Sequence, residues 1–322
     1  MKKIVYITRT LPEEAIQPLK EQYVVRMWEH EDLAMTPAQL KEAVRDVHAL
    51  WTMIDDQITR DIMEAAPNLE IITNLAVGYN NIDIEAAKEL DIIVTNTPDV
   101  LSETTADLAF ALLLATARRI TEAESVLREG KWQAWAPMQL TGMDIYGKTL
   151  GIIGMGRIGE AAARRALGFN MDVLYHNRTR KVEAEEAYGF TYADVDTLLQ
   201  QSDFVLLFAP LTEETRNMMT KREFARMKET AILINVARGP IVNEDDLYDA
   251  LKEGVIWGAG LDVYHVEPLP TNHKLLTLPN VVAIPHIGSA SIQTRLAMMA
   301  LNRQAILDVF EGKTPKNVLT NG

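Results

Sequence analysis

The sequence predicts an α/β fold with two domains, each built on a doubly wound parallel sheet. Short runs rich in β-branched and apolar residues alternate with helical runs along almost the whole chain. Runs such as FVLLFA and AILINVA are apolar on both faces, as strands covered by helices on each side must be. This alternation starts a second time near Gly147, and a chain of 322 residues has room for two domains of about 150 residues each.

The strands follow from these apolar runs, taken in chain order. In the first half we expect strands at Lys3–Ile7, Val24–Trp28, Ala49–Met53, Glu70–Thr73 and Ile92–Thr95. In the second half we expect them at Thr149–Gly154, Asp172–Tyr175, Phe204–Phe208, Ala231–Asn235, Ile256–Leu261 and Val281–Ile284.

Helix signals fill most of the intervals between these strands. Thr36-Pro37 supplies an N-cap and a first-turn proline, and Asn243 precedes three acidic residues that suit a helix start. The segment Ser102–Glu129 is expected to be a long helical connection between the two halves, with an apolar band at the spacing of Leu108, Leu112, Ala115 and Arg119. A last helix, about Ser291–Glu311, has no strand after it, so we expect it to return to the first domain.

These elements predict a discontinuous first domain with the second inserted in it. We place the first domain at residues 1–99 plus 289–322 and the second at residues 100–288.

Composition narrows the function classes. Asp+Glu 45 against Lys+Arg 32 gives a net charge of −13, which argues against non-specific nucleic-acid binding. The chain has no cysteine, which excludes disulfides and thiolate ligands and favours a reducing, cytoplasmic location. The longest apolar stretch, Leu108–Ala117, is half of the ~20 residues that a membrane span needs. We therefore expect a cytoplasmic protein with no membrane or nucleic-acid partner.

A glycine-rich turn follows the first strand of the second half. The strand at Thr149 runs into Gly154-Met155-Gly156-Arg157-Ile158-Gly159, and an Ala-rich helix follows. In this strand–turn–helix context the pattern is typical of a Rossmann dinucleotide site: the first glycine permits the turn, the second lets the backbone approach a pyrophosphate, and the third allows close packing. The first half reads Thr8-Arg9-Thr10-Leu11-Pro12 at the same place, so only the second domain should hold a dinucleotide.

The turn after the next strand indicates which dinucleotide. A site for NAD carries an acidic residue there to bind the ribose 2′-hydroxyl, but this chain has Asn177-Arg178-Thr179-Arg180. A missing acid with two nearby cations suits a 2′-phosphate, so we expect NADP(H) to be preferred and NAD(H) to remain possible. An exposed basic turn without a ligand is the alternative.

Several further motifs together resemble the D-isomer-specific 2-hydroxyacid dehydrogenase family, in its glyoxylate/hydroxypyruvate reductase branch. The motifs are Leu75–Asp83, Gly154–Gly159, Asn235–Pro240, Gly260–Pro268 and Pro285–Ser289, and the resemblance covers essentially the whole chain. It implies a Rossmann domain inserted in a flavodoxin-like substrate domain. It also implies a catalytic trio of Arg238, Glu267 and His286.

The chemistry of these residue types agrees with the resemblance. An arginine can hold a carboxylate with two parallel hydrogen bonds, and histidine is well suited to donate a proton near neutral pH. Arg238 and His286 both follow apolar strands, and ligands of doubly wound sheets bind at the carboxyl ends of strands. Glu267 can orient the imidazole and favour its charged form.

The resemblance implies the remaining contacts. The backbone N–H groups of Val77 and Gly78 would bind the substrate carboxylate, with a tight turn as the alternative. Beyond the glycine-rich and basic turns, the expected cofactor-binding residues are Thr105, Pro210, Val236, Ala237, Asp262, His286 and Gly288. No histidine has a second ligand at metal spacing, so we expect no metal.

These features predict an NADP(H)-preferring 2-hydroxyacid dehydrogenase that reduces small 2-keto acids such as glyoxylate or hydroxypyruvate, with 2-ketogluconate as a larger option. A phosphoglycerate-type dehydrogenase is the alternative enzyme, and a nucleotide-sensing, corepressor-like binding protein is the alternative of another class. The long amphipathic connector and the Trp132–Trp135 segment favour a homodimer. The tryptophans suit interface core, and the resemblance implies the alternative that one of them reaches the partner's site.

Overall fold

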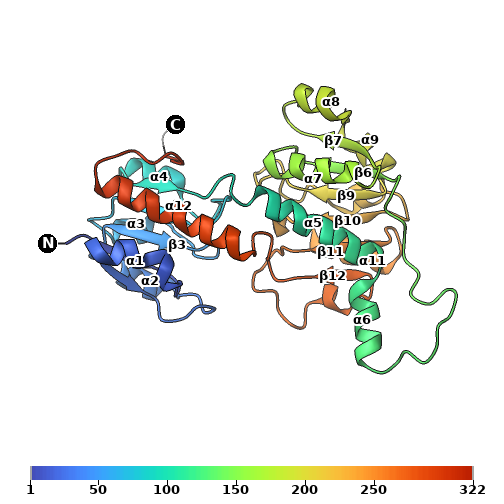
Figure 1. Ribbon diagram of the computed structural model, residues 1–322, viewed down its shortest axis with the longest axis horizontal. Helices are drawn as coiled ribbons and strands as arrows, with labels where there is room; N and C mark the ends of the chain where they lie inside the picture. Colours follow the sequence, from blue (N-terminus) through green and yellow to red (C-terminus); the bar gives the residue numbers. More distant parts are fainter. Residues whose placement is uncertain (1, 321–322) are drawn as a thin grey trace. The chain divides into compact units, whose positions relative to one another are not determined.

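The computed structural model describes residues 2–320 and divides the chain into two compact units. Unit 1 consists of Met1–Leu101 and Ala290–Gly322, and unit 2 of Ser102–Ser289. Each unit is built on its own sheet, and all strand pairs in both sheets are parallel (Figure 1). The α/β, doubly wound class predicted from the alternation is confirmed.

Unit 1 has a five-stranded sheet of order β2-β1-β3-β4-β5, the flavodoxin-like order. Its strands are β1 (Ile4–Ile7), β2 (Val24–Met27), β3 (Ala49–Thr52), β4 (Ile71–Asn74) and β5 (Ile93–Thr95). Its helices are α1 (Glu13–Gln22), α2 (Pro37–Ala43), α3 (Arg60–Glu64), α4 (Ile84–Glu89) and α12 (Ile292–Phe310). The last helix packs on α1 and β4, and Arg303 donates from Nη1 to the carbonyl of Ala15 at 3.0 Å.

Unit 2 has a seven-stranded sheet of order β12-β11-β10-β9-β6-β7-β8. Its strands are β6 (Thr149–Ile153), β7 (Asp172–His176), β8 (Thr191–Tyr192), β9 (Phe204–Leu207), β10 (Ile232–Asn235), β11 (Gly258–Leu261) and β12 (Val281–Ala283). Its helices are α5 (Ser102–Ala117), α6 (Ile120–Arg128), α7 (Arg157–Leu167), α8 (Val182–Tyr188), α9 (Val195–Gln201), α10 (Lys221–Phe224) and α11 (Glu244–Lys252), with 3-10 turns η1 (Gly239–Ile241) and η2 (Lys274–Thr277).

The central strands of unit 2 are buried on both faces. Leu206 and Ile234 face a core shared with α5 and α7, whereas Val205 and Leu233 face a second core shared with α9, α10 and α11. Since successive side chains of a strand point to opposite faces, a strand with helices on both sides must be apolar throughout. The prediction drawn from FVLLFA and AILINVA is confirmed.

The helical segment expected over Ser102–Glu129 consists of two helices, α5 and α6. The backbone breaks at Arg119, whose φ of 52° lies in the left-handed region, and α6 begins one residue later. The break occurs where the returning chain meets the helix end: Met143 donates its N–H to the carbonyl of Ala117 at 2.8 Å. A helix carbonyl satisfied by a distant N–H no longer needs the next helical turn.

Two smaller expectations also need correction. The apolar band on α5 is incomplete: Leu112 is buried and Ala115 packs against the core, but Leu108 is only half-buried, whereas Ala109, Phe110 and Leu113 are buried as well. Since α5 packs against both α7 and the strands β10 and β11, its buried surface is not one stripe. The two-residue strand β8 was not expected, because a strand this short carries no periodic signal.

The predicted helix starts are confirmed in detail. Thr36 forms a capping box with Gln39, and the Asn243 side chain accepts from the N–H groups of Asp245 and Asp246. Within residues 2–320 no helix combines the length and apolar character that crossing a bilayer requires.

Candidate functional site

The candidate site residues of unit 2 lie at the carboxyl ends of neighbouring parallel strands. Gly154 follows β6, Asn177 follows β7, Pro210 follows β9, Val236 follows β10 and Asp262 follows β11. His286 comes shortly after β12. Because the strands are parallel and paired in one sheet, these residues share one edge. The strand order reverses between β6 and β9, where doubly wound sheets bind their ligands.

The three glycines of the glycine-rich turn have three different local environments. Gly154 has a φ of +103°, and a side chain there would meet the backbone of Ala209 at 2.5 Å. A side chain at Gly159 would meet the carbonyl oxygen of Gly154 at 2.2 Å, so this glycine is needed for strand–helix packing. At Gly156 a side chain would meet nothing within 4 Å, which leaves the start of α7 open to an approaching ligand.

The residues between these glycines contribute unequally. Met155 is fully buried in the core, so only its backbone is able to touch a ligand. Arg157 is exposed and Ile158 is half-buried at the first turn of α7.

The two arginines of the basic turn after β7 differ in their hydrogen-bond partners. Arg180 binds Glu185 through Nε and Nη2, at 2.7 and 2.6 Å, and the hydroxyl of Tyr175 also donates to that carboxylate at 2.6 Å. The hydrogen bonds from Arg180 and Tyr175 lower the pKa of Glu185 to about 2. Arg178 is exposed and makes no hydrogen bond or ion pair within the described chain.

Glu267 and His286 form a hydrogen-bonded pair. Oε2 of Glu267 lies 2.6 Å from Nδ1 of His286, and Oε1 accepts from the N–H of Tyr264 at 2.8 Å. Burial by itself raises the pKa of Glu267, but the His286 contact, the Tyr264 N–H and the charge of Arg238 outweigh it, so the net shift is downward. Glu267 is therefore an anion at neutral pH.

The backbone aims the histidine at this partner. His286 has a φ of 49°, an uncommon conformation for a residue with a side chain. Its N–H donates to the carbonyls of Asp262 and Ile284, at 2.9 and 3.1 Å. Two hydrogen bonds thus hold the main chain in a conformation that few residues adopt freely.

Arg238 follows β10 and is half-buried. Asn235 holds its loop, accepting from the Ala237 N–H at 3.1 Å and donating to the Arg238 carbonyl at 3.0 Å. A side chain at Gly239 would lie 1.8 Å from the backbone of Tyr264, so only glycine lets the loop of Arg238 approach the loop of Glu267. Burial lowers the pKa of the Arg238 guanidinium, and the Glu267 carboxylate opposes this shift.

Asp262 carries a buried oxygen that no group in residues 2–320 hydrogen-bonds. Its Oδ1 accepts from the N–H of Ile287 at 2.6 Å, but Oδ2 has no partner. Burial raises its pKa to about 6, against the opposing effects of the Ile287 N–H, the charge of His286 and a weaker contribution from the Gly288 N–H. A side chain at Gly288 would lie 3.1 Å from this oxygen and 3.5 Å from Thr105. Three of the expected cofactor-binding residues, Thr105, Asp262 and Gly288, are therefore neighbours.

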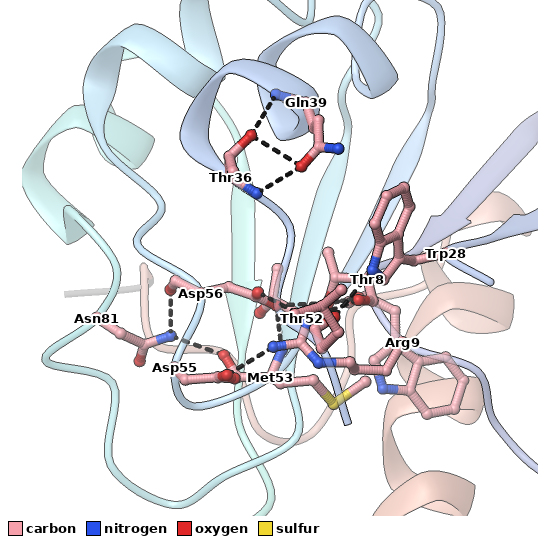
Figure 2. Close-up of polar contacts among 12 residues, drawn as sticks. Thr8, Arg9, Trp28, Thr36, Gln39, Thr52, Met53, Asp55, Asp56 and Asn81 are labelled. Carbon is pink, nitrogen blue, oxygen red and sulfur yellow. Dashed lines mark hydrogen bonds and ion pairs between the residues drawn. The ribbon is translucent and has the colours of Figure 1, made fainter. Parts of the chain in front are cut away.

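The carboxyl edge of unit 1 is occupied by its own side chains. Arg9, which follows β1, donates to Asp55 at 2.5 Å and to Asp56 at 3.2 Å, and Asp56 accepts from the N–H of Met53 at 2.8 Å (Figure 2). Burial raises the pKa of Asp56 although hydrogen bonds and Arg9 oppose the shift. Val77 and Gly78 lie beyond β4 on a loop that is half-buried.

Comparison with known proteins assigns the family. Residues 110–288 match the model of the D-isomer specific 2-hydroxyacid dehydrogenase NAD-binding domain. A glyoxylate reductase of Thermococcus gammatolerans is 49% identical over 323 aligned positions, which cover 99% of this chain and 96% of the relative. The chain belongs to the D-isomer specific 2-hydroxyacid dehydrogenase family.

Solved structures agree with this assignment. The TT0316 protein of Thermus thermophilus is 43% identical, with a TM-score of 0.92 and coverage of 98% of this chain and 99% of that one. An NADPH-dependent glyoxylate/hydroxypyruvate reductase of Sinorhizobium meliloti, solved with NADP and malonate, is 34% identical with a TM-score of 0.84, covering 99% and 97%. The resemblance drawn from the motifs is confirmed, and as a member of this dehydrogenase family the chain is an oxidoreductase with an NAD-binding domain.

Some residues of this dehydrogenase that contact the site were not expected from its sequence. Tyr264 supports Glu267, Asn235 supports the Arg238 loop, and Glu185 binds Arg180. Asn235 ends a buried strand, and a polar side chain in that place is a signal that could have been used. Nothing in the sequence marks Glu185 among its acidic neighbours.

Proposed function

We propose that the chain reduces small 2-keto acids, glyoxylate first among them, to D-2-hydroxy acids with NAD(P)H. The observation that carries the proposal is the Glu267–His286 pair at 2.6 Å, on the same sheet edge as the half-buried Arg238. A keto-acid reductase needs a cation to bind the charge of the substrate and an imidazole to transfer a proton. It also needs a carboxylate to orient that imidazole. The full-length relatives described as glyoxylate reductases support the choice of substrate.

Protonated His286 is the proton donor in this proposal. Its Nδ1–H donates to the Glu267 carboxylate, which leaves Nε2–H for the carbonyl oxygen of the substrate. After the transfer, Nδ1 keeps its proton because the Glu267 anion holds it, and the imidazole is neutral. Bound NAD(P)H supplies the hydride that the carbonyl carbon takes up.

Arg238 is the residue of unit 2 that we assign to the substrate carboxylate. A guanidinium remains charged at neutral pH even when burial lowers its pKa, and it matches a carboxylate with two parallel hydrogen bonds. In unit 1 we assign Val77 and Gly78 to substrate binding, with their backbone N–H groups as the donors.

The residues at the unit 2 edge fit a nicotinamide dinucleotide. The open space at Gly156 and the first turn of α7 suit a pyrophosphate, held by the backbone from Gly154 to Gly159. The unpaired Oδ2 of Asp262 suits an amide donor such as the carboxamide of nicotinamide. The other residues assigned to the cofactor are Thr105, Asn177, Arg178, Thr179, Arg180, Pro210, Val236, Ala237, His286 and Gly288.

We assign a preference for NADP(H), with NAD(H) as a weaker cofactor. Arg178 is exposed and makes no hydrogen bond or ion pair within the described chain, and its charge acts only over a longer range on Glu214, so its guanidinium is available to a 2′-phosphate. Arg180 already binds Glu185, so its contribution is smaller. A homologous reductase described as NADPH-dependent supports this assignment.

We also propose a homodimer formed through unit 2. The segment between α6 and β6 runs as a long loop away from the sheet (Figure 1). Trp132, Trp135 and Met138 on it are 55%, 78% and 78% exposed, and Ile120 and Leu127 of α6 are exposed beside them in sequence. Large apolar side chains exposed in one segment are typical of an interface. Sedimentation at micromolar concentration tests this, and a monomer would overturn it.

One assay separates the candidate functions. Purified protein is given NADPH or NADH with glyoxylate, hydroxypyruvate, 2-ketogluconate and 3-phosphohydroxypyruvate, and kcat/KM is measured for each pair. We expect the highest value for glyoxylate or hydroxypyruvate with NADPH. A maximum for 3-phosphohydroxypyruvate indicates a phosphoglycerate-type dehydrogenase. Tight NADPH binding without turnover of any keto acid indicates a nucleotide-sensing protein.

A further inference from the structure

The loop from Ala76 to Tyr79 has three successive carbonyl groups held by donors from within unit 1. The N–H of Thr97 donates to the carbonyl of Ala76 at 2.9 Å. The side-chain amide of Asn96 donates to Val77 at 2.8 Å, and that of Asn74 donates to Gly78 at 2.9 Å. A short loop with every carbonyl satisfied has little freedom to rotate its peptide planes.

These bonds decide where the intervening N–H groups point. The three peptides are trans, because Glu267-Pro268 is the cis bond of the described chain. In a trans peptide the N–H points opposite to the carbonyl of the same plane. The N–H groups of Val77, Gly78 and Tyr79 therefore point away from the donors, and none of them donates a hydrogen bond within residues 2–320. Three successive N–H groups of this loop are therefore available as donors to an anion.

The two asparagine side chains are themselves held in orientation. Asn74 is fully buried, and its Oδ1 accepts from the hydroxyl of Thr52 at 3.1 Å, which directs Nδ2 to Gly78. Nδ2 also donates to Oδ1 of Asn81 at 3.1 Å, and Asn81 in turn donates to the carbonyl of Asp56 at 3.0 Å (Figure 2). Asn96 is 7% exposed and follows the end of β5.

We propose that Asn74 and Asn96 are positioning residues: they hold the Gly78 and Val77 carbonyls so that three backbone N–H groups face the substrate carboxylate. This inference rests on the proposed function, because it assigns an orientation to the carboxylate-binding loop of that site. Neither asparagine touches substrate, so each acts only through the peptide plane that it holds.

The test measures carboxylate binding separately from folding and from cofactor binding. Asn74→Ala and Asn96→Ala are compared with wild type and with Thr36→Ala, which loses the cap of α2 in the same unit and does not touch the loop. The probe is oxamate, a keto-acid analogue that cannot be reduced, titrated onto the protein saturated with NADPH. KM and kcat for glyoxylate and the dissociation constant of NADPH are measured in parallel.

We expect both asparagine variants to weaken oxamate binding by about ten- to a hundredfold, since hydrogen bonds to a charged group carry about 1.5–3 kcal/mol. KM for glyoxylate should rise more than kcat falls, and NADPH binding should stay within about twofold of wild type because its residues lie in unit 2. Thr36→Ala should leave oxamate binding unchanged. Asn74→Ser serves if Asn74→Ala does not fold, since it also lacks the amide donor.

The outcomes that overturn the inference are distinct from failure of the proposed function. Oxamate affinity equal to wild type in both variants, with glyoxylate still reduced, rejects the positioning role and leaves the reductase intact. Equal loss in Thr36→Ala assigns the effect to unit 1 stability and also rejects it. Wild-type protein that neither binds oxamate nor reduces a keto acid overturns the proposed function and the inference with it.

Discussion

After its first strand, each unit turns into a helix where the strand order of its sheet reverses, and the two turns are built differently. In unit 2, β6 is followed by glycines that leave the backbone at Gly156 uncovered. In unit 1, β1 is followed by Arg9, only 6% exposed, which binds Asp56, only 4% exposed. A charged group binds at the reversal point of a doubly wound sheet. The local sequence decides whether this group belongs to a ligand, as in unit 2, or to the protein's own side chains, as in unit 1.

The difference has an energetic side. A buried ion pair is costly to disrupt, because removal of one partner leaves the other charge desolvated. In unit 1 the desolvated charges are therefore compensated as soon as the chain folds, because Arg9 and its aspartates pair with one another. This network gives the edge of unit 1 a fixed structure. Unit 2 leaves donors and an unpaired Asp262 oxygen, which stabilise the protein only when a ligand meets them.

The largest effect should come from removing the proton donor at the carboxyl edge of unit 2. His286→Ala removes the proton donor, and we expect the rate of keto-acid reduction to fall about 10²- to 10⁴-fold, the usual contribution of general acid catalysis. NADPH binding and thermal stability should change little. A variant that keeps more than about a tenth of wild-type kcat/KM would show that His286 is not the acid.

At the unit 1 edge the same kind of change should affect folding instead. Arg9→Ala leaves Asp56 buried without its cation, and we expect the free energy of unfolding to fall by about 3–5 kcal/mol. Urea titration measures it, with Arg45→Ala as the control, because Arg45 is exposed and, within residues 2–320, pairs only with Glu42 at the surface. A change as small as that control's would mean that the Arg9 network does not stabilise unit 1.

Asp262 should make the stability of unit 2 depend on pH. Burial raises its pKa from the ordinary aspartate value of 3.8 to about 6 in the folded chain. Between about pH 4 and pH 6 only the unfolded state ionises, so wild type should lose up to about 3 kcal/mol relative to Asp262→Asn, with no further change above pH 6. The facing charges are His286 and Glu267, which act in opposite directions.

The control for this pH dependence is Asp203→Asn. The hydrogen bond from Lys228 at 2.8 Å and the N–H of Thr149 outweigh burial and lower the pKa of Asp203. Wild type should therefore gain stability over this variant as pH rises through the acidic range. Unfolding free energies at several pH values give both slopes, and slopes of the same sign would contradict the assignment for Asp262.

Two glycines of unit 2 allow a test of whether the open backbone at Gly156 binds the pyrophosphate of the cofactor. Gly156→Ala adds a methyl group that meets no protein atom, so stability should stay within about 0.5 kcal/mol while NADPH binds about ten- to a hundredfold more weakly. Gly159→Ala forces its methyl group against the carbonyl of Gly154, so this variant should lose stability. Calorimetric titration and unfolding distinguish the two, and unaltered NADPH affinity in Gly156→Ala would exclude a pyrophosphate there.

The smallest effect concerns the choice between cofactors. Arg178→Ala should raise KM for NADPH about tenfold, the loss of one charge-assisted hydrogen bond, and leave KM for NADH nearly unchanged. Arg180→Ala should change either value by about threefold or less, because Glu185 already binds this exposed arginine. A larger NADPH defect in Arg180→Ala than in Arg178→Ala would reverse the assignment of the two arginines.

Much of the fold, and the catalytic residues at the carboxyl edge of unit 2, could be predicted from short-range patterns in the sequence. Buried parallel strands need apolar side chains on both faces, so their runs are visible wherever they exceed three or four residues. Capping residues such as Thr36 act within one turn of their own position. The family motifs with Arg238, Glu267 and His286 each follow a strand, and parallel strands bring their carboxyl ends to one edge.

The tertiary structure alone decided which polar groups have partners. Asn96 meets Val77 from 19 positions away, and Asp262 accepts from the Ile287 N–H through Oδ1 while its buried Oδ2 has no partner among the described residues. The break at Arg119 depends on Met143, which returns to the end of α5 from another part of the chain. A hydrogen bond needs a distance near 3 Å and a defined angle, and residues distant in sequence acquire these only when the whole unit has packed.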